Sequence, residues 1–370
     1  MVAVLFGGRS SEHAISCVTA RGVLSAIDAD RFEVIPIGIT KSGAFTLSTA
    51  DVSTYVLDGD VLPEVADNGS RIVWPDQAGS RELRVRDAGD ASGTGSRDMR
   101  SLGNVDVVFP ILHGPFGEDG TIQGMLELCD LPYVGSGVLA SSLGMDKHFT
   151  KSVLEREGIA VAPWRTVSHH EWTANAATVT AELEKMTLPV FVKPSRAGSS
   201  VGVSKVSDWA DLAAAMATAL AEDDRVLVEA GIVGREVECA VLQGRPSEPT
   251  RASVAGEIVI TGREFYDFEA KYLGAAGIEL VCPADLTAAE LAELQSQSIR
   301  AFEALGAAGL ARVDFFLTAT GFVLNEINTM PGFTPISMFP RCWQESGVGY
   351  SGLITELIEV ALAHRGGVSP

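Results

Sequence analysis

The chain has 370 residues, which at about 150 residues per domain predicts two or three domains, and its 46% hydrophobic content is enough for sizeable cores. Its formal net charge of −20 argues against a nucleic-acid-binding surface. No apolar run reaches transmembrane length and no signal-peptide pattern is evident, so we expect neither a membrane span nor secretion. The five scattered cysteines form no CxxC pair, which favours reduced thiols in the cytoplasm.

Short β-branched segments alternate with helical patterns along the chain, which is typical of a mixed α/β fold. Near the beginning, residues 2–8 predict a buried strand with a glycine turn, residues 10–27 a helix, and residues 32–39 and 105–112 further strands. These are Rossmann-like units, so ligands are expected beyond the carboxyl ends of the strands. Between them, residues 50–104 are rich in Asp, Gly and Ser and predict a surface excursion with a hairpin.

The middle of the chain predicts two pairs of helix and strand around a small-residue loop. The first helix ends at Gly158 and the first strand at Pro194, where the loop Ser195 to Ser204 begins. Residues 209–224 then predict a helix and residues 225–230 a strand.

The last third predicts a strand over residues 235–244, a polar loop near residues 266–272, and a helix with the capping box Thr287–Glu290 and a C-terminal Gly306. The strands ARVDFFL and GFVLNEIN, joined by TATG, predict a hairpin, and a final helix starts near Gly352. We therefore expect three domains: residues 1–138, Rossmann-like; residues 139–228, with the small-residue loop; and residues 229–370, with the hairpin.

The small-residue loop follows Lys193, which lies on a predicted strand. Small residues let backbone N–H groups approach a polyphosphate, serine hydroxyls add donors, and a lysine supplies a point charge. The loop is not a Walker A sequence, and a flexible turn between strands is the alternative.

The predicted hairpin gathers acidic side chains. Closing it across TATG sets Asp314 opposite Glu326 to within one residue, with Asn328 on the face of Glu326 and Arg312 on that of Asp314. Two carboxylates and an amide oxygen suit Mg²⁺ shared with phosphates, and an arginine beside them can stabilise an oxyanion. An ordinary solvated sheet face is the alternative.

Further candidates are polar residues in loops or at a helix start, each with a structural alternative. The Pro-Gly turn after Asn328 can point the Gly332 N–H at a reacting oxygen and place Ser337 near a carboxylate, or can simply reverse the chain. The others are His113, which packs in a loop as readily as it binds a ligand, Glu12 at a helix start, and Lys271 with Tyr272 in a possible lid.

These pieces resemble, in this order, the D-alanine–D-alanine ligases of the ATP-grasp superfamily. The matching segments span residues 4 to about 340 and include GGRSSEHAIS, HGPFGEDGTIQG, MDKHFTK, LPVFVKPSRAGSSVGVSK, FYDFEAKYL, ARVDFF and LNEINTMPGFTPIS. The resemblance implies a three-domain ATP-grasp fold with an N-terminal Rossmann-like domain. It also implies ATP-dependent joining of two D-alanine molecules through a D-alanyl phosphate, for peptidoglycan precursor synthesis in the cytoplasm, by a homodimer.

The resemblance also implies roles for residues that match the family's motifs. Those matching the ATP-binding positions are Lys147, Lys193, Ser199, Ser200, Glu229 and Glu236, and those matching the ligands of two Mg²⁺ (or Mn²⁺) ions are Asp314, Glu326 and Asn328. Glu12 matches the group that holds the first ammonium and forms a triad with Ser199 and Tyr272. Arg312 and the Gly332 N–H match an oxyanion-stabilising pair, Ser337 and Lys271 bind the second carboxylate, and His113 lies close to the first substrate.

Other functions stay open at this point. A Rossmann oxidoreductase would need GxGxxG, which is absent, and a non-catalytic ATP-grasp module would be expected to lose the acids and the lysine that are present here. A ligase of the same mechanism with D-serine or D-lactate as second substrate is the remaining alternative, although Tyr272 in EAKY favours D-alanine. Ala230 departs from the family, where a lysine often follows the hinge glutamate.

Overall fold

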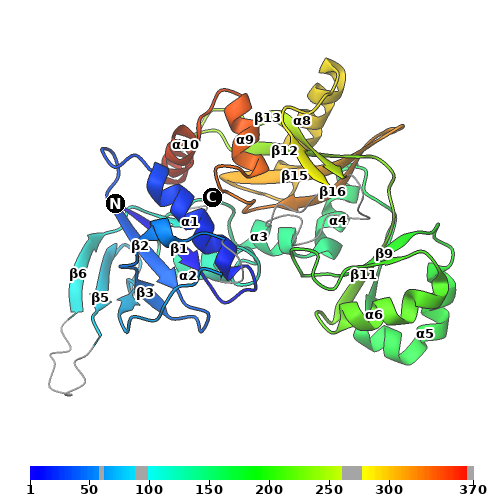
Figure 1. Cartoon of the computed structure of the whole chain (residues 1–370), viewed down its shortest axis with the longest axis horizontal. Coiled ribbons are helices and arrows are strands. Elements are labelled where there is room, and N and C mark those ends of the chain that lie inside the picture. Colours follow the sequence, from blue (N-terminus) through cyan, green and yellow to red (C-terminus); the bar gives the residue numbers. More distant parts are fainter. Residues whose placement is uncertain (58–61, 89–98, 261–276, 365–370) are drawn as a thin grey trace.

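A computed structural model describes residues 1–57, 62–88, 99–260 and 277–364. They form four small sheets flanked by helices, so the predicted mixed α/β class is confirmed (Figure 1). Within these ranges, no helix is both long and apolar enough to cross a bilayer. All five cysteines are free thiols.

The N-terminal sheet has the strand order β3-β2-β1-β7, and the central strand β1 runs parallel to β2 and β7. Its elements are β1 (Val2–Gly7), α1 (His13–Ala26), β2 (Val34–Ile39), β3 (Phe45–Leu47), β7 (Val107–Pro110) and α2 (Thr121–Leu128). All six residues of β1 are buried, as expected for a strand covered on both faces. The loops after β1 and β7 therefore leave the sheet at the same edge, where both carry candidate residues.

The excursion after β3 forms a sheet of its own, at the lower left of Figure 1. It begins with a short 3₁₀ turn, η1 (Val52–Thr54), and its antiparallel strands are β4 (Arg71–Val73), β5 (Glu82–Arg86) and β6 (Met99–Asn104). The predicted hairpin corresponds to β4 and β5, whereas β6 was not predicted. Most of β6 is exposed, and its sequence MRSLGN lacks the hydrophobic alternation by which a strand is predicted. Its pairing with β5 could therefore not be predicted from the sequence.

The central sheet is antiparallel, with the strand order β10-β9-β11-β8. This part of the chain comprises β8 (Trp164–Ser168), α5 (His169–Leu183), β9 (Val190–Pro194), β10 (Ser204–Val206), η2 (Trp209–Asp211), α6 (Leu212–Leu220) and β11 (Arg225–Ala230). The helices α3 (Val138–Met145) and α4 (Lys147–Arg156) precede it and connect it to the rest of the molecule (Figure 1).

The C-terminal sheet is antiparallel, with the order β14-β13-β12-β15-β16. Its strands and the helices packed on them are β12 (Arg235–Leu242), β13 (Arg251–Ile260), β14 (Ile278–Val281), α8 (Ala288–Ala304), β15 (Leu310–Thr318), β16 (Gly321–Asn328) and α9 (Met338–Glu345). Along β12, Val237 and Cys239 pack in the core under α8, whereas Ala240 and Leu242 pack in the core that contains α9. The period of two thus explains why helices cover opposite faces of this sheet.

The C-terminal helix α10 (Tyr350–Ala363) packs against α1 and β7 of the N-terminal sheet, so one hydrophobic core joins the two ends of the chain. The predicted capping box at Thr287–Glu290 is present, and Gly306 has φ +65°, as a helix-ending glycine requires. The division into domains at residues 138 and 228 stays a prediction; strand β11 of the central sheet runs on to Ala230.

Candidate active site

One cleft of about 380 Å³ lies where the N-terminal, central and C-terminal sheets meet. Every candidate residue within the described ranges lines it: Glu12, His113, Lys147, Lys193, Ser199, Ser200, Glu229, Glu236, Arg312, Asp314, Glu326, Asn328, Gly332 and Ser337. Lys271 and Tyr272 lie outside the described residues. Residues more than 300 positions apart in sequence therefore share one cavity.

The acidic face of the cleft is the β15–β16 hairpin. Asp314 is the register partner of Glu326, in agreement with the predicted pairing, and Asn328 donates to Asp314 at 3.0 Å. The guanidinium of Arg312 donates twice to the carboxylate of Asp314, at 2.7 Å each. It also lies 3.2 Å from Glu238. Burial alone would lower the pKa of Arg312, but the carboxylates outweigh this effect and raise it.

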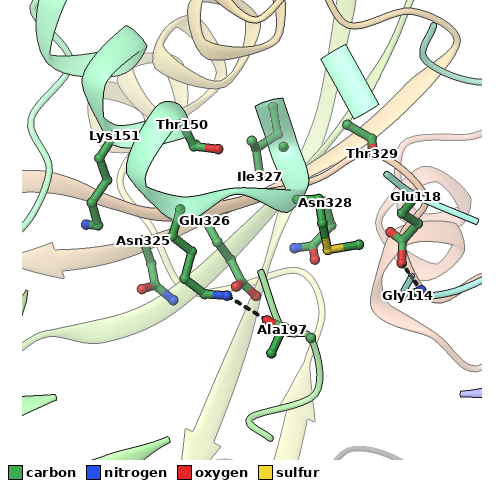
Figure 2. Close-up of a pocket in the computed structure, with 14 residues that line it drawn as sticks. Gly114, Glu118, Thr150, Lys151, Ala197, Asn325, Glu326, Ile327, Asn328 and Thr329 are labelled. Carbon is green, nitrogen blue, oxygen red and sulfur yellow. Dashed lines mark hydrogen bonds between the residues drawn. The ribbon is translucent and has the colours of Figure 1, made fainter. Parts of the chain in front are cut away.

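The hairpin contains a bulge next to the acidic pair. Asp314 pairs with Glu326, but Phe315 pairs with Leu324, so Asn325 is an extra residue on β16. Asn325 and Glu326, although consecutive, both line the cleft. Figure 2 shows them with Asn328 beneath the helix that carries Thr150 and Lys151.

This donor set fits a hard divalent cation. Asp314, Glu326 and Asn328 present only carboxylate and amide oxygens to an ion, the ligands that Mg²⁺ prefers, and they open onto a cleft with room for water and phosphate oxygens. Among the described residues, no three His, Cys, Asp or Glu side chains converge on one point. Water and phosphate oxygens of a bound substrate would complete the coordination of a cation here, as is usual for Mg²⁺.

The opposite wall carries lysines around a buried carboxylate. Glu229, at the end of β11, accepts from Lys193 of β9 and lies 3.1 Å from the ammonium of Lys151 on α4. Burial would raise the pKa of Glu229, but the two lysines lower it to about 2. This arrangement concentrates positive charge at the cleft while leaving Glu229 ionised.

Lys147 is the first residue of α4, and its ammonium donates to the carbonyl of Ala197 in the small-residue loop at 2.6 Å. The preceding residue, Asp146, caps this helix and is 3% exposed. Its carboxylate accepts from Ser195 at 2.8 Å and from Arg225. Asp146 therefore fixes the start of α4, the loop after β9 and the start of β11 relative to one another.

The small-residue loop has a strained backbone. Ser199 and Ser200 have φ of +50° and +58°, in the left-handed region that side chains disfavour. Such strain is typical of ligand-binding loops and costs about 1–3 kcal/mol per residue. The hydroxyl of Ser199 donates to Glu12, so the loop contacts the start of α1 across the cleft.

Glu12 immediately precedes α1, where its carboxylate lies between two loops. A Cβ at Gly114 would be 2.5 Å from its Oε2, and one at Gly198 would be 3.4 Å away. Nearby, burial and the charge of Glu12 raise the pKa of Glu118 to about 8, although its Oε2 accepts from the Gly114 N–H at 2.6 Å (Figure 2). Burial also lowers the pKa of His113, which favours its neutral form.

Gly332 and Ser337 follow β16 and line the cleft, and Ser337 immediately precedes α9. The Ser337 hydroxyl accepts from the Thr334 N–H at 3.1 Å and lies 2.7 Å from the Thr334 hydroxyl. A Cβ at Gly332 would be 3.3 Å from this hydroxyl, so these residues are adjacent. Glu236 lines the cleft from β12.

Family models for the N-terminus and the C-terminus of D-ala D-ala ligase match residues 1–136 and 153–359. The chain is 51% identical to the D-alanine–D-alanine ligase of Paenarthrobacter aurescens, over 99% of this chain and 96% of that protein. It belongs to the D-alanine–D-alanine ligase family. The ligase of Nocardia farcinica is also 51% identical, over 99% of this chain and 98% of that protein.

Solved structures agree with this assignment. VanG D-Ala:D-Ser ligase from Enterococcus faecalis superimposes with a TM-score of 0.79 at 32% identity, over 97% of this chain and 98% of that chain. The D-alanine–D-alanine ligase from Coxiella burnetii gives 0.78 at 32% identity, over 98% and 94%. The ATP-grasp fold expected from the sequence is confirmed.

This D-alanine–D-alanine ligase family member also has residues at the site that the sequence motifs did not single out. Glu118 lines the cleft, whereas Lys151 and Asp146 lie behind it, where they contact Glu229 and Ser195. Lys151 follows Lys147 by four positions, so helical spacing alone could have placed both on one face of α4. Glu118 is part of the HGPFGEDG segment, but the rise in its pKa depends on burial and on the distant Glu12. No local pattern predicts such a contact.

Proposed function

We propose that this chain is an ATP-dependent ligase that joins two D-alanine molecules to give D-alanyl-D-alanine, ADP and phosphate. Full-length identity of about half to D-alanine–D-alanine ligases supports the activity. The observation that carries the proposal is the shared cleft, in which the Ser199 loop and Lys193 face the acidic hairpin of Asp314 and Glu326. A triphosphate placed between them meets positive charge on one side and an oxygen-rich cation site on the other.

The chemistry requires a carboxylate to be activated before an amine can attack it. One D-alanine carboxylate attacks the γ-phosphate of ATP, which forms D-alanyl phosphate and releases ADP. The amine of the second D-alanine then attacks the acyl carbon, and phosphate leaves from a tetrahedral intermediate. The phosphoryl transfer itself depends mainly on positioning and charge stabilisation.

In this proposal, Lys147 and Lys193 bind the phosphates of ATP, and the N–H groups and hydroxyls at Ser199 and Ser200 cover them. The contact of Lys147 with the Ala197 carbonyl supports this, because it couples the lysine to the same loop. Glu229 and Glu236 are proposed for the nucleoside end. For Glu229, its ion pairs indicate a second role, which is to hold the side chain of Lys193.

The cation site is proposed to hold two Mg²⁺ or Mn²⁺ ions on Asp314, Glu326 and Asn328. When bound, these ions neutralise charge on the transferring phosphoryl group. The bidentate contact of Arg312 with Asp314 orients that carboxylate and places a guanidinium beside the cleft. Arg312 and the N–H of Gly332 are proposed to stabilise the oxyanion of the tetrahedral intermediate.

Glu12 is proposed to bind the ammonium of the first D-alanine, with His113 nearby, and Ser337 the carboxylate of the second. Burial favours the neutral form of His113, which is suited to hydrogen bonding with the substrate. Lys271 and Tyr272, proposed for the second carboxylate and for the triad with Glu12 and Ser199, lie outside the described residues.

The cation site is tested by the double variant Asp314→Asn/Glu326→Gln, which keeps the shape of both side chains. We expect loss of Mg²⁺-dependent phosphate release, measured with ATP and D-alanine, by at least 100-fold. Glu257→Gln is the matched control, because this carboxylate pairs with Arg235 in the same sheet but outside the cleft. Retained turnover in the double variant would contradict the metal assignment.

The second substrate needs its own test, since the D-Ala:D-Ser ligase VanG and the D-alanine–D-alanine ligase from Coxiella burnetii match this fold almost equally well. ADP formation should be compared with D-alanine, D-serine and D-lactate as the partner of D-alanine. We expect D-alanine to give the highest kcat/KM at neutral pH. A preference for D-serine or D-lactate would replace the product while leaving the phosphoryl-transfer chemistry intact.

We also propose that the enzyme acts in the cytoplasm as a homodimer and supplies the dipeptide for peptidoglycan precursors, and hence for cell wall and cell shape. The family supports this setting, and the free thiols are compatible with it. Light scattering of the purified chain tests the dimer, because a monomeric mass at micromolar concentration would contradict it.

A further inference from the structure

His13 is a buried histidine that the proposed chemistry does not use. It is 2% exposed, its Nδ1 lies 2.6 Å from the Gly8 carbonyl oxygen, and its Nε2 accepts from the Val65 N–H at 3.0 Å. Because a backbone N–H can only donate, Nε2 carries no proton. The proton is therefore on Nδ1 and is donated to Gly8.

The bond to Gly8 falls on the part of the chain that leads into Glu12. Gly7 and Gly8 have φ of +89° and +98°, and glycine at such positions has the largest freedom of any residue. The Ser10 hydroxyl donates to the His113 carbonyl at 2.6 Å and accepts from the Glu12 N–H at 3.2 Å. The ring of His13 thus holds the beginning of this turn at Gly8, and the contacts of Ser10 hold its end, where Glu12 reaches the cleft.

The bond to Val65 comes from the excursion, which matches none of the motifs discussed above. We call residues 62–70 the strap. The side chain of Val65 fills the space above two glycines, since a Cβ at Gly7 or Gly38 would be 2.8 or 2.6 Å from its methyl groups. Val65 is 7% exposed, so it packs as a core residue.

The strap is also fixed on both sides of Val65. Glu64 pairs with Lys41 at 2.6 Å, and the Ser70 hydroxyl accepts from the Leu47 N–H at 3.0 Å. Asn68 donates to the Leu47 carbonyl at 2.8 Å. Anchored to β3 and to the turn before it, the strap holds the Val65 N–H at a defined place for His13.

We propose that His13 is a positioning residue for the first substrate, and that the strap acts through it to hold the Gly7–Gly8 turn and therefore the carboxylate of Glu12. The inference rests on the proposed role of Glu12 in binding the first D-alanine ammonium. It gives residues 62–70 a function in substrate binding, although none of them lines the cleft.

Two substitutions separate the two bonds of the ring. His13→Asn places an amide near the position of Nδ1, which keeps the donor to Gly8 but does not reach Val65. His13→Gln reaches the position of Nε2 and keeps an acceptor for Val65 but loses the donor to Gly8. One net hydrogen bond corresponds to about a fivefold change in a binding constant.

The assay is steady-state ADP release by the full chain, with the two D-alanine Michaelis constants resolved from the dependence of rate on D-alanine. We expect each His13 variant to raise the first-site constant about fivefold, with kcat, the second-site constant and the KM for ATP within twofold of wild type. A purely structural role would instead lower the amount of active enzyme and leave all Michaelis constants unchanged. That outcome overturns the proposal.

Glu12→Gln is the reference variant in the same assay. If it raises the first-site constant strongly while both His13 variants leave it unchanged, the positioning role is wrong and the role of Glu12 stands. If Glu12→Gln has no effect on that constant, the role of Glu12 fails and the inference fails with it. Should the His13 variants not fold, Val65→Ala carries the test, because it loosens the strap without removing a hydrogen bond; an unchanged first-site constant there also overturns the proposal.

Discussion

Glu229 offers a quantitative test of how the lysine wall of the cleft is held together. Its pKa of about 2, against an ordinary value of 4.5, means that its ionised form is favoured in the folded protein over the unfolded one. At about 1.4 kcal/mol per pKa unit this amounts to about 3 kcal/mol. Removing one partner of a buried ion pair typically costs a similar 3–5 kcal/mol. We therefore expect Glu229→Gln to lower the stability at pH 7 by about 3 kcal/mol.

Urea unfolding followed by tryptophan fluorescence measures this loss, because Trp164, Trp172 and Trp209 all lie in the part of the chain that forms the central sheet. Glu182→Gln is a suitable control in the same region. Glu182 pairs with Arg165 at 2.6 Å, but its side chain is 44% exposed, so its loss should cost less than about 0.5 kcal/mol.

The sign of the pH effect gives a second check. Because folding depresses the pKa of Glu229, its contribution is complete above about pH 4.5 and is lost as the pH falls towards 2. The stability difference between wild type and Glu229→Gln should shrink over that range. Adding Lys151→Met to the variant should recover part of the loss, since one buried ammonium is removed. Equal urea midpoints for wild type and Glu229→Gln at pH 7 would refute the reasoning.

Three other substitutions address the remaining walls of the cleft. Burial raises the pKa of Glu118 to about 8, so between pH 4.5 and 8 the folded protein without ATP or metal keeps a proton that the unfolded chain has lost, and its stability falls as the pH rises. Glu118→Gln should remove this slope of up to about 1.4 kcal/mol per pH unit. Urea midpoints that change equally between pH 5 and 8 in both proteins would argue against it. Gly114→Ala should reduce kcat/KM for D-alanine at least tenfold, because its Cβ would be 2.5 Å from the Glu12 carboxylate. Gly79→Ala is the control, since Gly79 has a similar positive φ but no atom within 4 Å of its Cβ position, and it should change only stability. Equal kinetics in the two variants would exclude the contact. Arg312→Lys should reduce ADP release at least tenfold, because an ammonium cannot reproduce two parallel bonds to a carboxylate, and near-normal turnover would show that positive charge alone suffices.

The hairpin that carries the acidic pair could be predicted because its information is local. Alternating strands joined by a four-residue turn fix which residues face each other, so the sequence places Asp314 opposite Glu326 to within one residue. The bulge at Asn325 could not, because nothing in LNEIN distinguishes an extra residue from a regular one. The helix capping signals at Thr287 and Gly306 were local in the same sense.

The contacts that hold α4 against the central sheet lie beyond local patterns. The network of Asp146 depends on Ser195 and Arg225, and that of Glu229 on two lysines from different elements. Each partner occurs in an ordinary helix or strand sequence, and only the packing of those elements brings the charges together. The resemblance to a known family supplied the common cleft in advance, but it did not indicate the role of Lys151.

The bulge on β16 makes the number of residues in the hairpin as important as their identity. Because side chains alternate along a strand, the extra residue at Asn325 reverses the faces on its two sides and allows both Asn325 and Glu326 to reach the cleft. Residues added in the TATG turn would leave this reversal untouched. Deleting Asn325 would instead rotate one side of the ribbon by half a turn, so homologous chains should tolerate length variation at the tip of the hairpin and resist it at its base.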